Sequence, residues 1–170
     1  RKWIRILIIA IILIVAGIMS SSYFTRNKAK PLSVDDFKEI MINEGFTVIE
    51  TSQEDKEDYM DGQYKLNEYL ILTNNGDIFI TFYECGSEEL ASKLFDDLTQ
   101  TSFSNKMGEV KTSTKTFTNW KISTSAANLD GSTACFVNVN IGKAMISFID
   151  VSTTNSEEIY ELVKSLGYQI

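Results

Sequence analysis

The sequence predicts an α+β fold, with an N-terminal transmembrane helix followed by a duplicated α-βββ unit in the order α-βββ-α-βββ-α. Three observations predict this fold. Some segments repeat apolar residues at helical spacing, and others alternate apolar and polar residues around glycine turns. The two halves of the chain also share one order of hairpin and helix. Together they indicate a largely antiparallel six-stranded sheet with helices packed on it.

The N-terminal segment is strongly apolar. Residues 6–25 are 20 consecutive uncharged residues, which at about 1.5 Å per residue span roughly 30 Å, the thickness of a bilayer core. Trp3 and Tyr23 are the expected interfacial anchors at its two ends. We therefore expect a transmembrane anchor over residues 1–24 and a basic tether over residues 25–32. A cleaved signal peptide is the alternative, because the most apolar part is only 14 residues long.

The orientation of this anchor is less clearly marked. Three basic residues precede the apolar stretch and three come after it, so the positive-inside rule does not choose a side. A short basic tail before a single span usually exports the domain on its C-terminal side, so we expect residues 33–170 outside the cytoplasmic membrane. The alternatives are secretion after signal cleavage and a cytoplasm-facing domain on an inverted anchor. The composition, rich in Ile, Lys and Asn and poor in Arg, Pro and Cys, suggests a bacterial protein from an AT-rich genome.

Three amphipathic helices are expected in a single domain over residues 33–170. Each has apolar residues three and four positions apart, a serine near its start and a glycine after its end. They cover about residues 34–44, 88–103 and 156–166. Before the first helix, Ser33 and Asp36 fit a capping box, and Gly45 is the expected stop.

Seven segments are strand candidates, of which the duplicated pattern takes three in each half. Asn74-Asn75-Gly76 and Ile141-Gly142 are the expected tight turns of two hairpins. The candidates cover about residues 46–50, 68–73, 77–84, 109–113, 116–123, 133–140 and 143–151.

The internal repeat divides the domain at about residues 33–86 and 87–170. Residues 75–84 align with residues 141–150 at an offset of 66, including the turn glycine and the acidic strand end. The helices after these hairpins also begin alike, with two glutamates and an aliphatic residue. Since the match is a pattern rather than an identity, chance convergence of ordinary hairpins and helices is the alternative.

Charge and missing residue types exclude several functions. Residues 31–170 hold all 23 acidic residues against 10 lysines and no arginine, a net charge of −13. Such a domain repels phosphate backbones, so we expect no nucleic-acid partner. The chain has no histidine, which excludes histidine-based triads and metal sites. Its two cysteines form no CxxC motif, so zinc ribbons and iron–sulfur clusters are excluded and no cofactor is expected.

The densest acidic stretch supplies the first candidate binding residues, Asp58, Tyr59 and Asp61. Clustered carboxylates can hold Ca²⁺, but Tyr59 occupies a position of the EF-hand spacing that needs an oxygen ligand. No metal site is therefore predicted. The favoured interpretation is a solvated acidic loop between two strands.

Other candidates each have a simpler structural explanation. Trp120 is a candidate stacking platform for a sugar or partner, unless it packs half-buried on the sheet. Cys85 and Cys135 are a candidate disulfide if their Cα atoms lie within about 7 Å, with two buried free thiols as the favoured alternative. Glu84 and Asp150 end equivalent strands and are a candidate acid/base pair if the repeat brings them together.

These observations favour a membrane-anchored extracytoplasmic binding domain without catalytic activity. Its partners would be the lipid bilayer, through the N-terminal helix, and another protein, an envelope polymer or a small ligand. One alternative is a carboxylate-based hydrolase acting on cell-envelope glycans, which requires a cleft lined by two or more acids. The other is a cytoplasm-facing regulatory domain.

Overall fold

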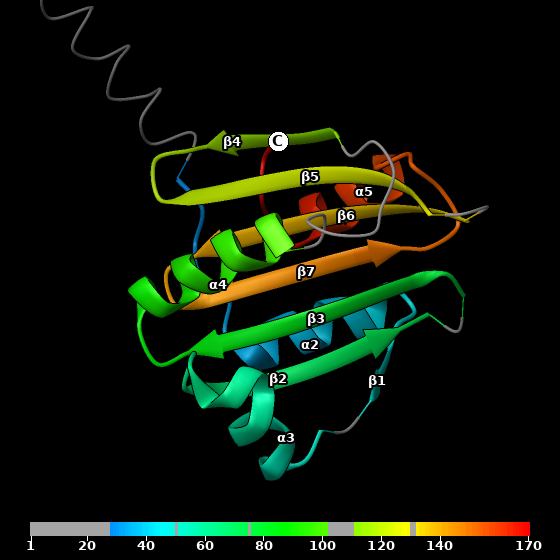
Figure 1. Ribbon diagram of the computed structural model, residues 1–170. Coiled ribbons are helices and arrows are strands. Elements are labelled where there is room, and N and C mark those ends of the chain that lie inside the picture. The colour runs from blue at the N-terminus through cyan, green and yellow to red at the C-terminus, as the bar shows by residue number, and fades with distance from the viewer. Residues whose placement is uncertain (1–27, 50, 75, 102–110, 130–131) are drawn as a thin grey trace, which may run out of the picture.

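One antiparallel sheet forms the centre of the fold in the computed structural model (Figure 1), which describes residues 28–49, 51–74, 76–101, 111–129 and 132–170. Within these ranges the strand order is β1-β2-β3-β7-β6-β5-β4. The strands are β1 (Thr47–Ile49), β2 (Leu66–Thr73), β3 (Ile78–Cys85), β4 (Lys111–Thr116), β5 (Trp120–Leu129), β6 (Ser132–Ile141) and β7 (Ala144–Asp150). The helices are α2 (Val34–Asn43), α3 (Gln53–Asp58), the 3-10 helix η1 (Tyr59–Gly62), α4 (Glu88–Thr101) and α5 (Glu157–Ser165).

The predicted α+β class and antiparallel sheet are confirmed, but the number of strands is not. Among the described residues the sheet has seven strands rather than six. Both β4 and β5 join it, because the chain reverses between them where the Phe117 N–H donates to the Trp120 carbonyl at 2.8 Å. The acidic stretch expected as a loop also forms a helix, α3. There Ser52 and Asp55 make a reciprocal capping box, with the side chain of each accepting the backbone N–H of the other.

Helices cover both faces of the sheet (Figure 1). Strand alternation sends Ile80 and Phe82 of β3 to one face, where the Phe82 ring stacks on Phe37 of α2 with centroids 4.7 Å apart. Helix α5 packs on the same face through its buried apolar side. The opposite face carries Tyr83 and Met145, which pack against α4.

The local signals at the helix ends act in part as the sequence predicts: only the Ser33 half of the expected Ser33–Asp36 box is present, and Ser156 makes no side-chain cap hydrogen bond at the start of α5. The Ser33 Oγ accepts the N–H of Asp36 at 3.1 Å and begins α2. Gly45, with φ of +90°, ends it in the left-handed conformation that glycine adopts without steric cost. The Ser87 Oγ likewise accepts the Leu90 N–H at 3.2 Å at the start of α4.

The two halves meet between β3 and β7. These strands pair in antiparallel register, and Thr81 lies opposite Ser147, the residue aligned with it in the predicted repeat. This register suits a twofold axis perpendicular to the sheet. Helices α4 and α5, which follow the two strands, are not related by this axis, since α4 covers one face of the sheet and α5 the other.

The sheet keeps two candidate pairs of side chains apart. Cys85 and Cys135 are both buried and free, and they belong to the apolar clusters on opposite faces of the sheet. The candidate disulfide is therefore wrong. Glu84 and Asp150 also lie at opposite ends of the β3–β7 ladder, roughly 20 Å apart for six residues of strand. Antiparallel pairing of β3 with β7 separates this acid/base pair instead of joining it.

The predicted anchor residues Trp3 and Tyr23 lie outside the described residues. Among the helices within the described ranges, none is long and apolar enough to cross a membrane. The end of the predicted tether is described from residue 28 onward, and it packs on the domain.

Candidate functional site

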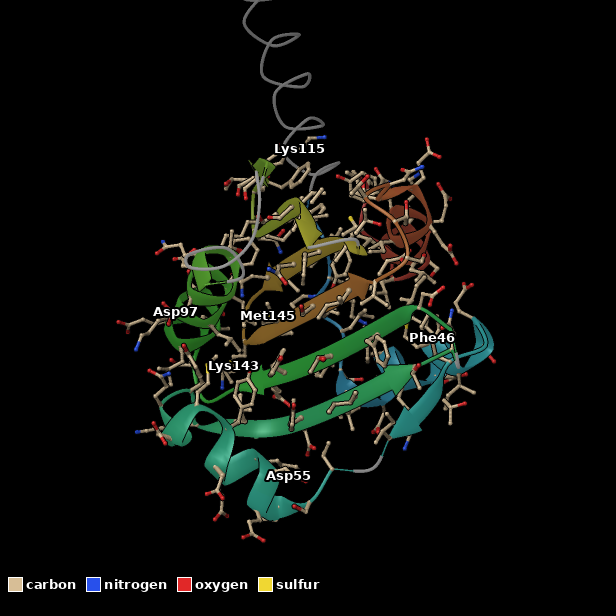
Figure 2. The ribbon with its side chains drawn as sticks, turned by 45° about the vertical axis from the view of Figure 1, so that its right-hand side comes forward. Phe46, Asp55, Asp97, Lys115, Lys143 and Met145 are labelled. Carbon is tan, nitrogen blue, oxygen red and sulfur yellow. The ribbon has the colours of Figure 1, made fainter. Side chains whose placement is uncertain are left out.

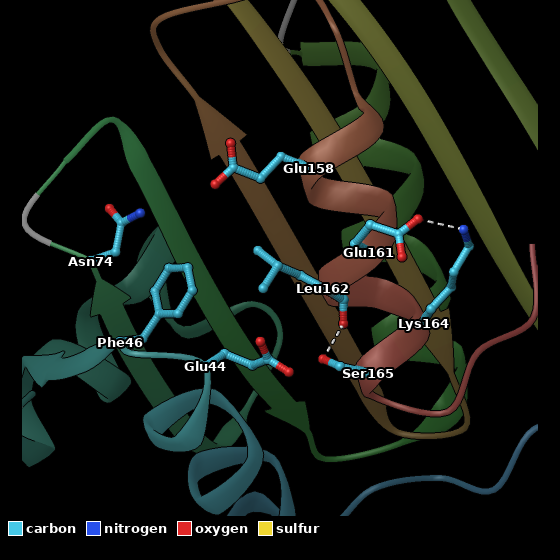
Figure 3. Close-up of a pocket in the computed structure, with 8 residues that line it drawn as sticks. All are labelled: Glu44, Phe46, Asn74, Glu158, Glu161, Leu162, Lys164 and Ser165. Carbon is cyan, nitrogen blue, oxygen red and sulfur yellow. Dashed lines mark hydrogen bonds and ion pairs between the residues drawn. The ribbon is translucent and has the colours of Figure 1, made fainter.

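A groove between the C-terminal end of α2 and helix α5 is the site of greatest chemical interest (Figure 3). Its volume is about 590 Å³. Both helices lie on the same face of the sheet, so the groove runs between them above the strands. The lining residues are Glu44, Phe46, Asn74, Glu158, Glu161, Leu162, Lys164 and Ser165.

The residues that follow α2 form one wall of the groove and part of its floor. After Gly45 turns the chain, the Phe46 N–H donates to the Met41 carbonyl at 2.9 Å and the Phe46 side chain is buried in the core. Figure 2 labels Phe46 in its place near α2. Glu44, one residue before the turn, stays exposed at the rim. The turn therefore places a carboxylate directly beside an aromatic floor.

The helical repeat of α5 supplies the opposite wall. Leu162 points toward the core and is buried, whereas Glu158, one helical turn before it on the same side, and Glu161 are exposed. The Ser165 hydroxyl donates to the Leu162 carbonyl at 2.9 Å, which uses the hydroxyl within the helix end. Figure 3 shows Leu162 directed toward Phe46, so the two apolar side chains form the floor together.

The charges of the groove are unbalanced. Glu161 is paired with Lys164 at 2.6 Å, and this pair lies on the side of α5 away from Phe46 (Figure 3). Glu44 and Glu158 have no ion pair with any residue that the structure describes. Two carboxylates therefore remain available beside an apolar floor, an arrangement that suits a positively charged group joined to an apolar one.

The predicted binding residues of the acidic stretch lie elsewhere, at the β2 edge of the sheet. Asp58 and Asp61 are exposed. Tyr59 is half-buried, with its ring 5.2 Å from both Tyr69 and Tyr83, and its hydroxyl donates to that of Tyr83 at 3.1 Å. The Tyr59 ring thus fastens α3 and η1 to the sheet, and a binding role for these three residues stays a prediction.

Burial of this tyrosine cluster changes its acidity. Burial is the main cause that raises the pKa of Tyr59, Tyr69 and Tyr83, and for Tyr83 the neighbouring Tyr59 adds to the effect. Burial also raises the pKa of Tyr64, whose hydroxyl donates to the Asp97 Oδ2 of α4 at 2.5 Å. These hydroxyls stay protonated and join η1, the sheet and α4.

The segment between Tyr59 and Tyr64 is held in an uncommon conformation. Met60 and Asp61 adopt left-handed backbone angles, with φ of 46° and 57°, at a cost of roughly 1–2 kcal/mol each for residues other than glycine. The tyrosines on both sides are packed in the cluster, and this packing maintains the turn. Within the described ranges, no group of three or more Asp, Glu or Cys side chains lies close enough to hold a metal ion.

Trp120 is not an exposed platform. Its side chain is only 4 % exposed, with Phe117 stacked on it at a centroid distance of 4.1 Å and Tyr168 on another side at 5.3 Å. A hollow of about 270 Å³ lies beside it. The indole packs more deeply than the half-buried position expected, because the C-terminal residues after α5 return over β5.

No family model, no curated protein and no solved structure matches the chain.

Sequence reasoning missed Glu44 and Glu158 as partners in one site. They are far apart in the chain, and each resembles an ordinary exposed charge at a helix end. Their common signal is that each flanks the apolar stripe of a predicted helix, beside Met41 and Leu162 respectively. Only the packing of both helices on one face of the sheet brings the two carboxylates to one groove.

Proposed function

We propose that the protein is a membrane-anchored extracytoplasmic binding domain, and that the groove between α2 and α5 takes a cationic, partly apolar segment of a partner protein. The observation that carries the proposal is the pair of carboxylates, Glu44 and Glu158, beside the floor of Phe46 and Leu162. A lysine or arginine side chain presents the matching parts, an aliphatic stem and a charged head. The groove would bury the stem and pair the head.

The charge of the whole domain supports the same class of partner. Residues 31–170 have a net charge of −13, which attracts basic ligands over distances of about a Debye length and speeds their association. The groove adds local selection to this general attraction. The geometry offers less to the hydrolase alternative, since Glu84 and Asp150 lie at opposite ends of a ladder.

The groove is tested with a fluorescent peptide of alternating lysine and leucine, measured by anisotropy against the purified full chain. We expect binding that weakens with salt, and weaker binding of a lysine–serine peptide that lacks the apolar part. Replacing Glu44→Gln and Glu158→Gln together removes two exposed ion pairs with the lysines of the peptide, each of about 0.5 kcal/mol. The affinity for the lysine–leucine peptide is therefore expected to fall about fivefold.

The matched control changes two exposed acids of α3, Glu54→Gln and Glu57→Gln, which alters the net charge equally. This variant is expected to bind within a factor of two of the unaltered protein. An equal loss in both double variants would show that only net charge matters, and absence of binding to the lysine–leucine peptide would also refute the groove.

The anchor and its direction form a separate part of the proposal. They are supported by the 20 uncharged residues from 6 to 25 and by the basic residues on both sides. Protease treatment of intact cells or protoplasts carrying a C-terminal tag is expected to remove the tag while a cytoplasmic control survives. A tag that is cut only after lysis would place the domain in the cytoplasm.

We also infer that the two hairpins descend from one duplicated unit. The offset of 66 residues in the sequence and the pairing of Thr81 with Ser147 support this origin. The opposite placement of α4 and α5 means that the helices no longer share one arrangement. The groove depends on that difference, because α5 lies next to α2 only by leaving the face that α4 covers.

A further inference from the structure

The end of the predicted tether is fastened to the domain by one side chain. The Ala29 N–H donates to the Asn119 Oδ1 at 3.0 Å, and the Asn119 Nδ2 donates to the Ala29 carbonyl at 2.7 Å. One amide thus satisfies both backbone groups of a residue 90 positions away. Ala29 and Leu32 also pack against the core, and Pro31 lies against the turn at Gly142.

The contact between Ala29 and Asn119 lies at one end of the sheet. Residues 117–119, between β4 and β5, and residues 142–143, between β6 and β7, lie together there because Trp120 pairs with Ile141. We call this the tether end. The far end holds residues 76–77 and 151–156, since the Val151 N–H donates to the Asp77 carbonyl.

Chain length then limits how far the tether end can lie from a bilayer. The uncharged stretch ends at Thr25, four residues before Ala29. Four residues of fully extended chain reach at most about 14 Å. If residues 6–25 span the membrane, the docked Ala29 holds the tether end within that distance of the membrane surface.

The groove begins at the far end. Glu44 lies just after the C-terminal end of α2, Asn74 lies next to the β2–β3 turn, and Glu158 is in the first turn of α5. The strand β7 alone, from Ala144 to Asp150, separates the two ends by roughly 20 Å. In Figure 1 the arrowheads of β3 and β4 mark the tether end and that of β7 the far end.

The two ends of the sheet also differ in charge, and the difference favours the tether end as the side that faces the membrane. Four exposed lysines at the tether end have no ion pair with any described residue: Lys28, Lys30, Lys115 and Lys143. The same end also carries exposed acids in the first turns of α2 and α4: Asp35, Asp36, Glu88 and Glu89. The far end carries four exposed acids: Glu44, Asp77, Glu157 and Glu158. Anionic headgroups attract the lysines and repel the acidic end, but the docked tether is the main constraint.

We propose that the docked tether holds the domain in one orientation on the bilayer, with the tether end against the lipid headgroups and the groove opening away from them. This rests on the membrane anchor of the proposed function. The surface at the tether end is then a lipid-facing surface, and the partner segment reaches the groove from the side away from the membrane.

Energy transfer to headgroup-labelled lipid tests the orientation with the full chain in vesicles. A donor dye is attached at Lys143→Cys in one protein and at Glu157→Cys in another, under native conditions that leave the buried Cys85 and Cys135 unlabelled. In the proposed orientation the two dyes lie at distances from the bilayer that differ by roughly 20 Å. Transfer from position 143 is therefore expected to exceed transfer from position 157 at least twofold. Equal transfer at both positions, or greater transfer from position 157, would overturn the orientation.

The tether contact is tested in the same assay. Asn119→Ala removes both hydrogen bonds to Ala29 and is expected to reduce the difference between the two positions, whereas Asn43→Ala on the exposed side of α2 leaves it unchanged. An undiminished difference with Asn119→Ala would contradict the role of the contact. Vesicle flotation is measured in parallel. Failure to float refutes the anchor and this inference together, whereas flotation with equal transfer refutes the orientation alone.

Discussion

The buried thiols make a measurable prediction about stability at alkaline pH. Burial raises the pKa of Cys135 from 9.0 to about 11, with the nearby Asp150 adding to the effect. The pKa of Cys85 rises equally, first through burial and then through Glu84. Each folded-state pKa is raised, so the stabilising contribution is complete below pH 9 and is lost as the pH rises through 11.

The size of the effect can be calculated from the two pKa values. At pH 11 the thiol of the unfolded chain is about 100-fold more thiolate than thiol, whereas the native thiol is about half ionised. The resulting factor of about 50 corresponds to about 2.3 kcal/mol of lost stability for each cysteine. At pH 8 the same calculation gives less than about 0.1 kcal/mol.

Urea unfolding of the protein and of Cys135→Ala, both with a reductant present, isolates this contribution. The alanine variant loses packing by an amount that does not depend on pH, and the tyrosines titrate in both proteins. We therefore expect the stability advantage of the unaltered protein over the variant to shrink by about 2 kcal/mol between pH 8 and pH 11. Cys135 is the cleaner site, because the charge of Cys85 also raises the pKa of Tyr59 and Tyr64.

An advantage of the same size at both pH values would refute the reasoning, since it would mean that the thiol titrates alike in the folded and unfolded chains. Thiol reagents provide an independent check. Both cysteines are expected to react with them only as fast as the protein unfolds, because both are fully buried.

Two further predictions concern hydrogen bonds around α4 and β5. Tyr64→Phe removes the hydroxyl that donates to Asp97 and is expected to lower the free energy of unfolding by about 1–2 kcal/mol; Asp97→Ala should add little to it, and full additivity in a double-mutant cycle would contradict the contact. Ser123→Ala removes a buried hydroxyl without a partner among the described residues, so stability should stay equal or rise by up to about 1 kcal/mol. The matched Ser125→Ala loses a hydrogen bond to Thr112 and should lower stability by about 0.5–1 kcal/mol. Urea unfolding measures all of these variants, and a loss with Ser123→Ala as large as with Ser125→Ala would contradict the second prediction.

The missed helix α3 illustrates how local and tertiary signals combine. Its capping box, Ser52 and Asp55, is visible in the sequence, but six helical residues are too few to show an apolar stripe. None of its residues is buried. The segment is held instead through Tyr59, which packs beside β2 and β3, and that contact exists only once the sheet has formed.

Local chemistry determined most of the secondary structure. Ser33 begins α2 and Gly45 ends it, through hydrogen bonds and backbone angles that involve near neighbours only. The sequence by itself therefore determined where that helix lies. The apolar runs that form β3 and β7 and the turn at Gly142 are equally local signals. Composition alone also determined the acidic charge of the domain and the absence of histidine chemistry.

Only the tertiary structure decided which segments meet. The periodicity of α5 shows that it buries one side, but not which face of the sheet receives it, because both faces of the central strands are apolar. That choice places Glu158 beside Glu44 and makes the groove. Strand pairing likewise sends Cys85 and Cys135 to opposite faces. These outcomes depend on contacts between residues distant in sequence, where many pairings satisfy the same local pattern and packing selects one.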